Sequence, residues 1–181
     1  MPSKIENSRH CLEYLGAALR KIRIAHFHYP LLQAALERYK EEDEDGLPHI
    51  SIQAHFEGIV LCVASAIDKT CEAAAFIWEQ PYKRNSILGM INQNFPEVKL
   101  GEMIRFQKDL QEVRNRMVHR NSEKIRDSSG WYIEDNLGVY SGNRDLISYA
   151  KTALDYGDKL NIPIRSLQGH QSPPSRNITE A

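Results

Sequence analysis

The sequence predicts an all-α protein, a bundle of four to five helices with a small β-hairpin inserted before the last helix. Three observations support this prediction. Long stretches repeat apolar residues at steps of three and four, the spacing of one helix face. Proline, glycine and acidic clusters separate these stretches. One short segment late in the chain is rich instead in aromatic and turn residues.

The bulk composition fits a single globular domain. The chain has 181 residues, of which 41% are hydrophobic and 26% charged. No apolar run approaches the length of a membrane span, and the N-terminal residues lack the apolar core of a signal peptide. Three cysteines, an odd number, argue against a disulfide framework. We therefore expect a cytoplasmic protein without membrane association.

The first half of the chain predicts two long helices. Residues 5–43 carry apolar residues with helical spacing, and Pro30 within them predicts a kink or break near His28. An acidic run at 41–45 reads as a solvated linker. The second helix, from Ser51 to Glu79, is rich in alanine, glycine and serine. Small side chains allow other helices to approach closely, so we expect it at the centre of the bundle.

The second half predicts shorter elements. Helices are expected over 85–95, 99–121 and 144–160, with a hairpin at about 129–141 that pairs 131–134 with 138–140. Gly, Ser, Pro and Gln dominate from Pro163 onward. We therefore predict a helical domain over residues 1–162 and a disordered tail over residues 163–181.

The helix expected over 99–121 carries the residues with the clearest chemistry, Arg114, Asn115 and His119. A guanidinium matches phosphate oxygens, and an imidazole transfers protons near neutral pH. Asn115 can donate to a phosphate oxygen or hold the imidazole. This set suits cleavage of an RNA phosphodiester through its neighbouring 2′-hydroxyl. His119 would act as base or acid and Arg114 would stabilise charge on phosphorus.

Charge and geometry give this segment mixed support. The whole chain has a net charge of -1, so attraction for nucleic acid must be local. Between residues 105 and 126 basic residues outnumber acidic ones, and Arg116 and Arg120 are candidates for substrate binding. A solvated face of mixed charge explains the same residues equally well. On a straight helix Arg114 and His119 also point about 140° apart, so they would converge only at a distorted helix end or across a dimer interface.

The segment Arg114-Asn115-Arg116-Met117-Val118-His119 resembles the signature of the HEPN superfamily, in which an Arg and a polar residue precede a His near the end of a late helix. The resemblance implies a small all-α bundle and a homodimer in which two motifs face each other. It also implies an endoribonuclease that uses no metal or other cofactor, as in toxin–antitoxin and defence systems. Arg114, Asn115 and His119 are the only positions carried over.

Two features depart from this family pattern. Many HEPN toxins have a tyrosine two residues after the His, where this chain has Asn121, and the aromatic hairpin is not part of the minimal bundle. Some HEPN domains lack activity, so a non-catalytic module for dimerisation or protein interaction stays open, with an antitoxin or another protein as partner. A plain helical scaffold that matches the motif by chance is the third alternative.

The remaining candidates indicate structure more than chemistry. His26 and His28 point about 160° apart on a helix, which does not suit a shared metal. His49, His55 and Glu57 match no metal-binding spacing, so no metal site is predicted. Asp68 could face the motif helix and orient Arg114. Aromatic residues of the hairpin could stack on bases but more often fix a hairpin to a bundle; they are Trp131, Tyr132 and Tyr140.

Overall fold

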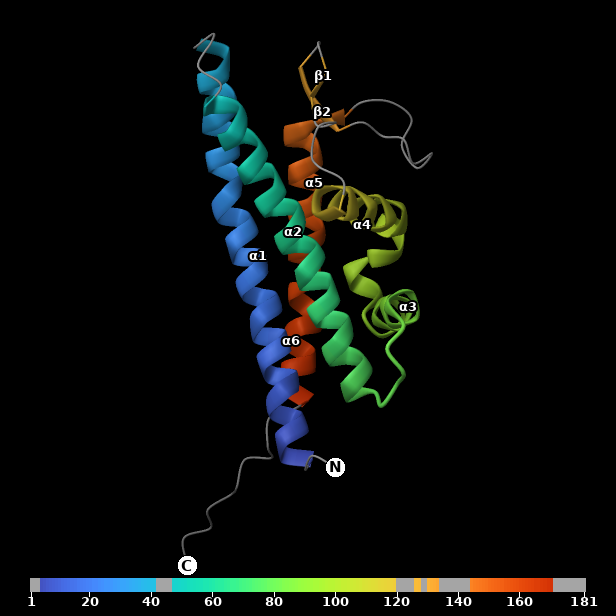
Figure 1. Ribbon diagram of the computed structural model, residues 1–181. Helices are drawn as coiled ribbons and strands as arrows, with labels where there is room; N and C mark the ends of the chain where they lie inside the picture. Colours follow the sequence, from blue (N-terminus) through green and yellow to red (C-terminus); the bar gives the residue numbers. More distant parts are fainter. Residues whose placement is uncertain (1–3, 42–46, 120–125, 128–129, 134–143, 171–181) are drawn as a thin grey trace, which may run out of the picture.

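The computed structural model describes residues 4–41, 47–119, 126–127, 130–133 and 144–170, and it confirms an all-α bundle (Figure 1). The α-helices are α1 (Lys4–Glu41), α2 (Leu47–Ile77), α3 (Arg84–Asn94), α4 (Ile104–His119), α5 (Leu146–Lys159) and α6 (Asn161–His170). Two 3₁₀ turns, η1 (Pro96–Val98) and η2 (Leu100–Met103), lie between α3 and α4. Three short strands, β1 (Arg126–Asp127), β2 (Gly130–Ile133) and β3 (Arg144–Asp145), precede α5.

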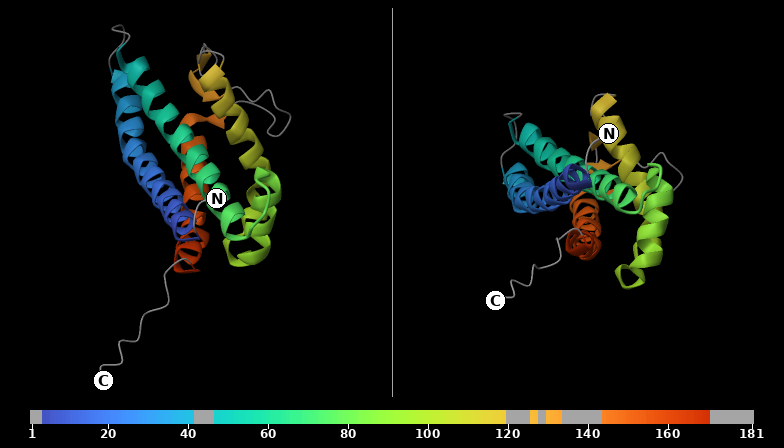
Figure 2. Two further views of the ribbon diagram at one scale, coloured as in Figure 1. Left: turned by 60° about the horizontal axis from the view of Figure 1, so that its bottom comes forward. Right: turned by 90° about the horizontal axis from the view of Figure 1, so that it is seen from below.

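The two long helices form the base of the fold. They run antiparallel and side by side, and α5 and α6 follow each other along the same pair (Figures 1 and 2). As predicted, α2 is central, because it packs against α1, α3, α4 and α5. Each large apolar side chain removed from water contributes about 1.5–3 kcal/mol. The buried face of α2 includes Ile52, Phe56, Ile59, Val60, Val63, Ile67, Cys71 and Ala74.

Of the kink or break predicted near His28, the break is wrong, because α1 is a single helix on both sides of Pro30. A proline inside a helix removes one backbone hydrogen bond and costs about 3 kcal/mol. Ala25 before Pro30 and Leu32 after it are both fully buried. Packing against α2 on both sides offsets the lost hydrogen bond and keeps the helix continuous.

A histidine pair joins α1 to α2 close to this proline. His28 Nδ1 and His55 Nδ1 lie 3.1 Å apart, so one ring donates to the other when both are neutral. The ring of His28 lies over Gly58, where a Cβ atom would come within 2.8 Å of it, so only glycine permits this approach. Burial, and secondly the neighbouring His55, lower the pKa of His28 from its ordinary value of 6.5.

Acid is expected to weaken this contact between α1 and α2. The unfolded chain binds more protons than the folded one between the lowered pKa of His28 and 6.5. The contribution of His28 to the free energy of unfolding is therefore complete above pH 6.5. It is lost as the pH falls toward the lower pKa that His28 has in the folded protein. Urea unfolding of wild type and His28→Gln, at neutral pH and about pH 5, measures this loss. The same pH dependence in both proteins would contradict the assignment.

The side of α2 away from α1 is covered by α3 and α4, and α5 completes the core between the layers (Figure 2). Phe106 of α4 packs between Tyr149 and Tyr156 of α5, with ring centroids 5.2 and 6.3 Å apart. Phe56 of α2 meets Tyr149 at 5.9 Å. These aromatic contacts fix the helix that carries the predicted motif against the two central helices.

The disordered tail predicted from Pro163 is corrected in part, because α6 extends from Asn161 to His170. Pro163 lies in the first turn of α6, where a proline costs no helical hydrogen bond. Ile164 and Leu167 are buried, and α6 packs on α1. The helix was not predicted because the segment is mostly polar and only one face of it is apolar. Residues 171–181 lie outside the described part of the chain.

The region of the predicted hairpin contains strands with other partners. β2 is antiparallel to β1, with Trp131 opposite Arg126, and to β3, with Ile133 opposite Arg144. The predicted partner segment, 138–140, lies outside the described residues, so its pairing with 131–134 stays a prediction. The side chains of Trp131, Tyr132 and Tyr140 also lie outside the described part.

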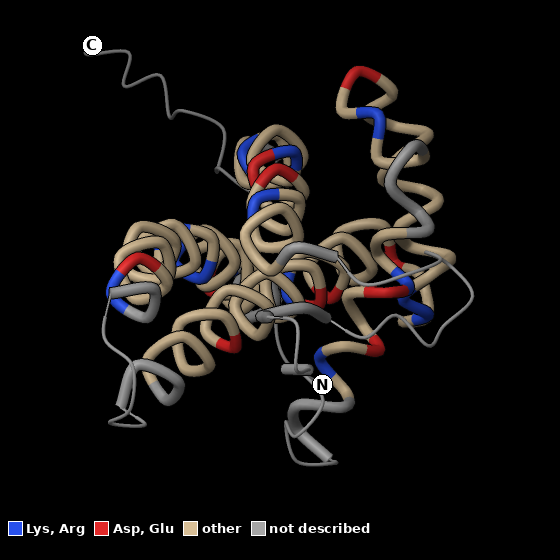
Figure 3. The backbone as a smooth tube through the Cα atoms, turned by 90° about the horizontal axis from the view of Figure 1, so that it is seen from above, with Lys and Arg blue, Asp and Glu red and all other residues tan. Residues whose placement is uncertain are grey.

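The charged side chains are distributed over the described helices without a large region of one sign. Lysine and arginine are interspersed with acidic residues over the described helices (Figure 3). None of these helices is both long and apolar enough to cross a membrane.

Cys11, Cys62 and Cys71 are buried and free of disulfides. Burial raises the pKa of Cys11 to about 11 and of Cys71 to about 12, so these thiols stay protonated at neutral pH.

Candidate functional site

The predicted motif lies on α4, the strongly amphipathic helix of residues 104–119. Its apolar face packs into the core through Phe106, Leu110 and Val113, as predicted from their spacing. Arg114 and Asn115 follow Val113 directly and are half-buried at the edge of that face. The core contacts of α4 therefore fix where the backbone of Arg114 and Asn115 lies and which way the two residues face.

Arg114 and Asn115 hydrogen-bond to each other. Arg114 Nη1 donates to Asn115 Oδ1 at 2.8 Å, and Gln111 Nε2 donates to the same oxygen at 3.3 Å. Both donors approach one amide oxygen, so the NH₂ group of Asn115 is on the other side of the amide. Asn115 thus keeps its donor nitrogen available next to a permanently charged guanidinium.

A second arginine extends this arrangement to α3 and α2. Arg84, the first residue of α3, donates from Nη1 to Gln111 Oε1 and forms an ion pair with Asp68 Oδ1 at 3.1 Å. The side chains of Arg84 and Asp68 are 15% and 28% exposed. The resulting polar network runs through Asp68, Arg84, Gln111, Asn115 and Arg114 and connects three helices.

The network orients both amides by a simple rule of donors and acceptors. Arginine has no acceptor, so Arg84 can bind only the oxygen of Gln111. That contact turns the nitrogen of Gln111 toward Asn115, whose oxygen must then face it. Arg84 therefore fixes the orientation of Gln111. Arg114 fixes that of Asn115 directly, because it donates to the same Asn115 oxygen at 2.8 Å.

Arg84 also carries unused hydrogen-bonding capacity. Its Nε and Nη2 atoms are buried and find no acceptor among the described residues. Buried donors without an acceptor raise the free energy of the folded state. Among the described residues, the contacts that hold Arg84 are those to Asp68 and Gln111.

Asp68 does not orient Arg114 by direct contact, as its position in the sequence suggested, because its ion pair is with Arg84. Arg84 and Gln111 were not recognised as members of the site. No local pattern marks Arg84, which lies thirty positions from Arg114 in the sequence. Gln111 did carry a signal, because it precedes Asn115 by four residues on the same helix face.

His119 is the last residue of α4, and the helix is continuous from Arg114 to it. Helical spacing therefore separates the two backbone positions by about 140° around the axis, as on a straight helix. The side chains of His119 and Arg116 and the whole of Arg120 lie outside the described part, so their proposed roles stay predictions. Asp109, one of the acidic residues of the predicted basic segment, is buried.

The other candidate residues take structural contacts. His26 Nε2 lies 2.8 Å from Asp158 Oδ1 and links α1 to α5. His55 pairs with His28, and Glu57 accepts a hydrogen bond from Gln53 at 2.9 Å. Among the residues that the structure describes, no three His, Cys, Asp or Glu side chains gather in a way that could hold a metal ion.

No family model matches this chain, and no curated protein or solved structure matches it either. The HEPN resemblance therefore stays a prediction from residues 114–119.

Proposed function

We propose that this chain is a HEPN-like RNA-binding domain that cleaves RNA as a homodimer without a metal ion, in a toxin–antitoxin or defence setting. The observation that supports the proposal is the fixed pair of Arg114 and Asn115, with the charge and the amide donor side by side on α4. A phosphate oxygen is the ligand that such a pair suits best. Core packing and the Asp68–Arg84–Gln111 contacts hold the pair in place before RNA binds.

The proposed reaction uses the ribose next to the scissile phosphate. The 2′-oxygen forms a bond to phosphorus while the bond from phosphorus to the 5′-oxygen breaks, which leaves a cyclic phosphate and a free 5′-hydroxyl. A base removes the 2′-hydroxyl proton, and an acid gives a proton to the leaving oxygen. His119 supplies one of these proton transfers, and Arg114 and Asn115 neutralise the charge that builds on the phosphoryl oxygens.

The geometry of α4 is compatible with the proposed homodimer and gives a reason for it. Because His119 and Arg114 occupy backbone positions about 140° apart, one helix does not direct both at the same atom. A second copy related by twofold symmetry would bring its own α4 toward this one. His119 of one chain would then act beside Arg114 of either chain.

A non-catalytic HEPN-like module for dimerisation or protein binding is the second candidate. Arg114 is only half-exposed and already hydrogen-bonded, as a purely structural arginine would be. In that case the polar network would only join α2, α3 and α4, and RNA would have no effect on it. An antitoxin or another protein would be the partner.

Binding of uncleavable RNA at several salt concentrations distinguishes the two candidates. The probe is a single-stranded RNA with 2′-O-methyl on every ribose. If Arg114 contacts a phosphate, Arg114→Met should weaken binding for all sequences and reduce the slope of log K against log salt by roughly 0.7–1. Arg9→Met is the matched control, because Arg9 is an exposed arginine of α1 whose ion pair within the described residues is with Glu13. Equal slopes for both variants would contradict the proposal.

A further inference from the structure

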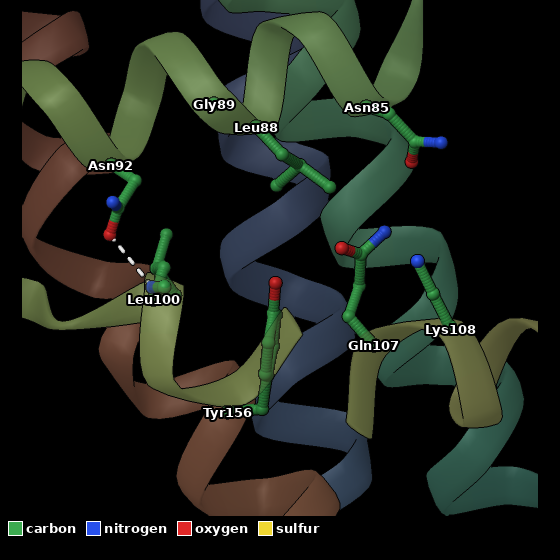
Figure 4. A pocket seen from close by; sticks show the side chains of 9 residues that line it. Asn85, Leu88, Gly89, Asn92, Leu100, Gln107, Lys108 and Tyr156 are labelled. Carbon is green, nitrogen blue, oxygen red and sulfur yellow. Dashed lines mark hydrogen bonds between the residues drawn. The ribbon is translucent and has the colours of Figure 1, made fainter. Parts of the chain in front are cut away.

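A pocket of about 270 Å³ lies beside the polar network, between α3, η2, α4 and α5 (Figure 4). Leu88 and Leu100 supply apolar walls, and Asn85 and Gln107 supply amides. Lys108 is the only charged residue among the described residues that line it, and it is exposed. This combination suits a small ligand with an uncharged part that has hydrogen-bonding edges and with a negative charge at its outer end.

Two largely buried side chains turn polar groups toward this pocket. Gln107 is 6% exposed and Tyr156 is 1% exposed, and neither the amide nor the hydroxyl is hydrogen-bonded to a described residue. In Figure 4 the hydroxyl of Tyr156 points from α5 toward α3. Neither group is among the described polar atoms that are fully buried without a partner, so both are open to the pocket. Both groups are therefore placed to pair with water or with a ligand in the pocket.

The pocket is built rather than accidental. Asn92 of α3 accepts a hydrogen bond from the Gly101 backbone N–H at 2.8 Å, which joins η2 to α3 across one end of the pocket. Lys99 directly before η2 has a left-handed φ of 55°, which turns the chain back toward α3. Burial raises the pKa of Tyr156 above its ordinary value, so its hydroxyl remains a donor at neutral pH.

The position of the pocket on α4 connects it to Arg114. Gln107, Gln111 and Arg114 follow at steps of four and three, so they share one face of the helix. Gln107 and Arg114 differ by about 20° around the axis and roughly 10 Å along it. An RNA strand whose phosphate binds Arg114 can therefore reach this pocket if it follows the same face of α4.

We propose that this pocket is a nucleobase subsite, which takes an unstacked base of the RNA whose phosphate lies at Arg114 and Asn115. The inference rests on the proposed RNA-binding function. An amide such as that of Gln107 offers one donor and one acceptor side by side, the pattern that base edges match. The Tyr156 hydroxyl adds a second donor, the leucines cover the faces of the base, and Lys108 lies at the rim for its phosphate. Single-stranded RNA is commonly recognised through bases removed from the stack in this way.

Mononucleotide binding tests the subsite directly. The probes are the four nucleoside 5′-monophosphates, with ribose 5-phosphate and inorganic phosphate as ligands that lack a base. Calorimetry or NMR titration of the full chain should detect at least one nucleotide, bound at least tenfold more tightly than ribose 5-phosphate. Equal affinity for ribose 5-phosphate, or no nucleotide bound, would overturn the proposal.

Gly89 provides a variant at the edge of the pocket. Gly89 is exposed and lines the pocket, and a Cβ atom there meets nothing within 4 Å, so the side chain of Gly89→Leu fits without a clash and should obstruct the mouth of the pocket. Gly169 on α6 is equally open and exposed, which makes Gly169→Leu the matched control. Gly89→Leu should reduce nucleotide affinity at least tenfold and Gly169→Leu should leave it unchanged. Equal affinities would count against the subsite.

Two conservative variants test the individual contacts. Gln107→Met removes the amide with little change of shape, and Tyr156→Phe removes only the hydroxyl. Each should weaken the preferred nucleotide about tenfold, the value of one hydrogen bond of 1.4 kcal/mol. Unchanged affinity in both variants, with their native melting cooperativity intact, would contradict the assignment.

The results separate the subsite from the proposed function. RNA binding that depends on Arg114, with no nucleotide bound in the pocket, would reject the subsite and leave the function in place. Nucleotide binding that Gly89→Leu abolishes, with RNA binding that Arg114→Met does not change, would support the subsite and reject the function of Arg114.

Discussion

Replacing Arg84 with methionine is expected to lower the free energy of unfolding by about 2 kcal/mol, measured by urea unfolding. The variant leaves the carboxylate of Asp68 without its partner in a site where it is 28% exposed. Removing one member of a buried ion pair costs about 3–5 kcal/mol, and the exposure of Asp68 to water reduces that figure here. Methionine keeps most of the packing volume, so the loss reports mainly on charge and hydrogen bonding.

A double-mutant cycle separates the ion pair from simple packing. Asp68→Asn combined with Arg84→Met removes both charges, so the double variant should be more stable than the sum of the two single losses predicts. The difference should be about 1 kcal/mol, because the two side chains are in direct contact. Strict additivity would mean that Arg84 and Asp68 do not stabilise each other.

Arg84→Met alone is expected to release the amide of Gln111. Without Arg84, nothing among the described contacts fixes the oxygen of Gln111, and either end of that amide can face Asn115. The side-chain NH₂ signals of Gln111 should shift or broaden in NMR spectra of Arg84→Met, while Arg114 continues to hold the oxygen of Asn115. Gln53→Ala, which breaks an amide contact on α2, should leave the Gln111 signals unchanged. Unaltered Gln111 signals in Arg84→Met would show that Arg84 does not orient Gln111.

Local sequence patterns predicted most of the helices but not the contacts between them. Apolar spacing located α2 and α4 because one face of each is buried over several turns. The same reasoning missed α6, where Pro163, Ile164 and Leu167 are the buried apolar residues of a largely polar segment. It also placed a break at Pro30, because the packing that keeps α1 continuous comes from α2.

The candidate site shows the same division. Arg114 and Asn115 could be selected from the sequence because they are adjacent on one helix. Arg84 could not, since its place beside Gln111 depends on how α3 packs against α4. The pocket was also missed, because Gln107 and Tyr156 come from helices far apart in the sequence and carry no motif. Tertiary packing, not local propensity, brings these groups together.

Arg114→Ala and His119→Ala are each expected to slow RNA cleavage by at least about a hundredfold. Removing one preorganised group that stabilises transition-state charge costs roughly 10²–10³ in rate, and loss of a general acid or base costs 10²–10⁴. The neighbouring Val113 is buried in the core, whereas Arg114 lies at the edge of the apolar face and donates to Asn115. Removing the Arg114 side chain should therefore change the site more than the fold. Stability of both variants should stay within about 1 kcal/mol of wild type.

Cleavage of RNA by the purified full chain, in the presence of a metal chelator, tests the central claim most directly. Wild type is compared with Arg114→Ala and His119→Ala, and with Arg9→Ala as a control for an exposed arginine distant in sequence. We predict that wild type and Arg9→Ala cleave the RNA to products with cyclic phosphate ends, and that the other two variants are at least a hundredfold slower. Cleavage at the wild-type rate by Arg114→Ala and His119→Ala, or no cleavage by wild type, would contradict the account.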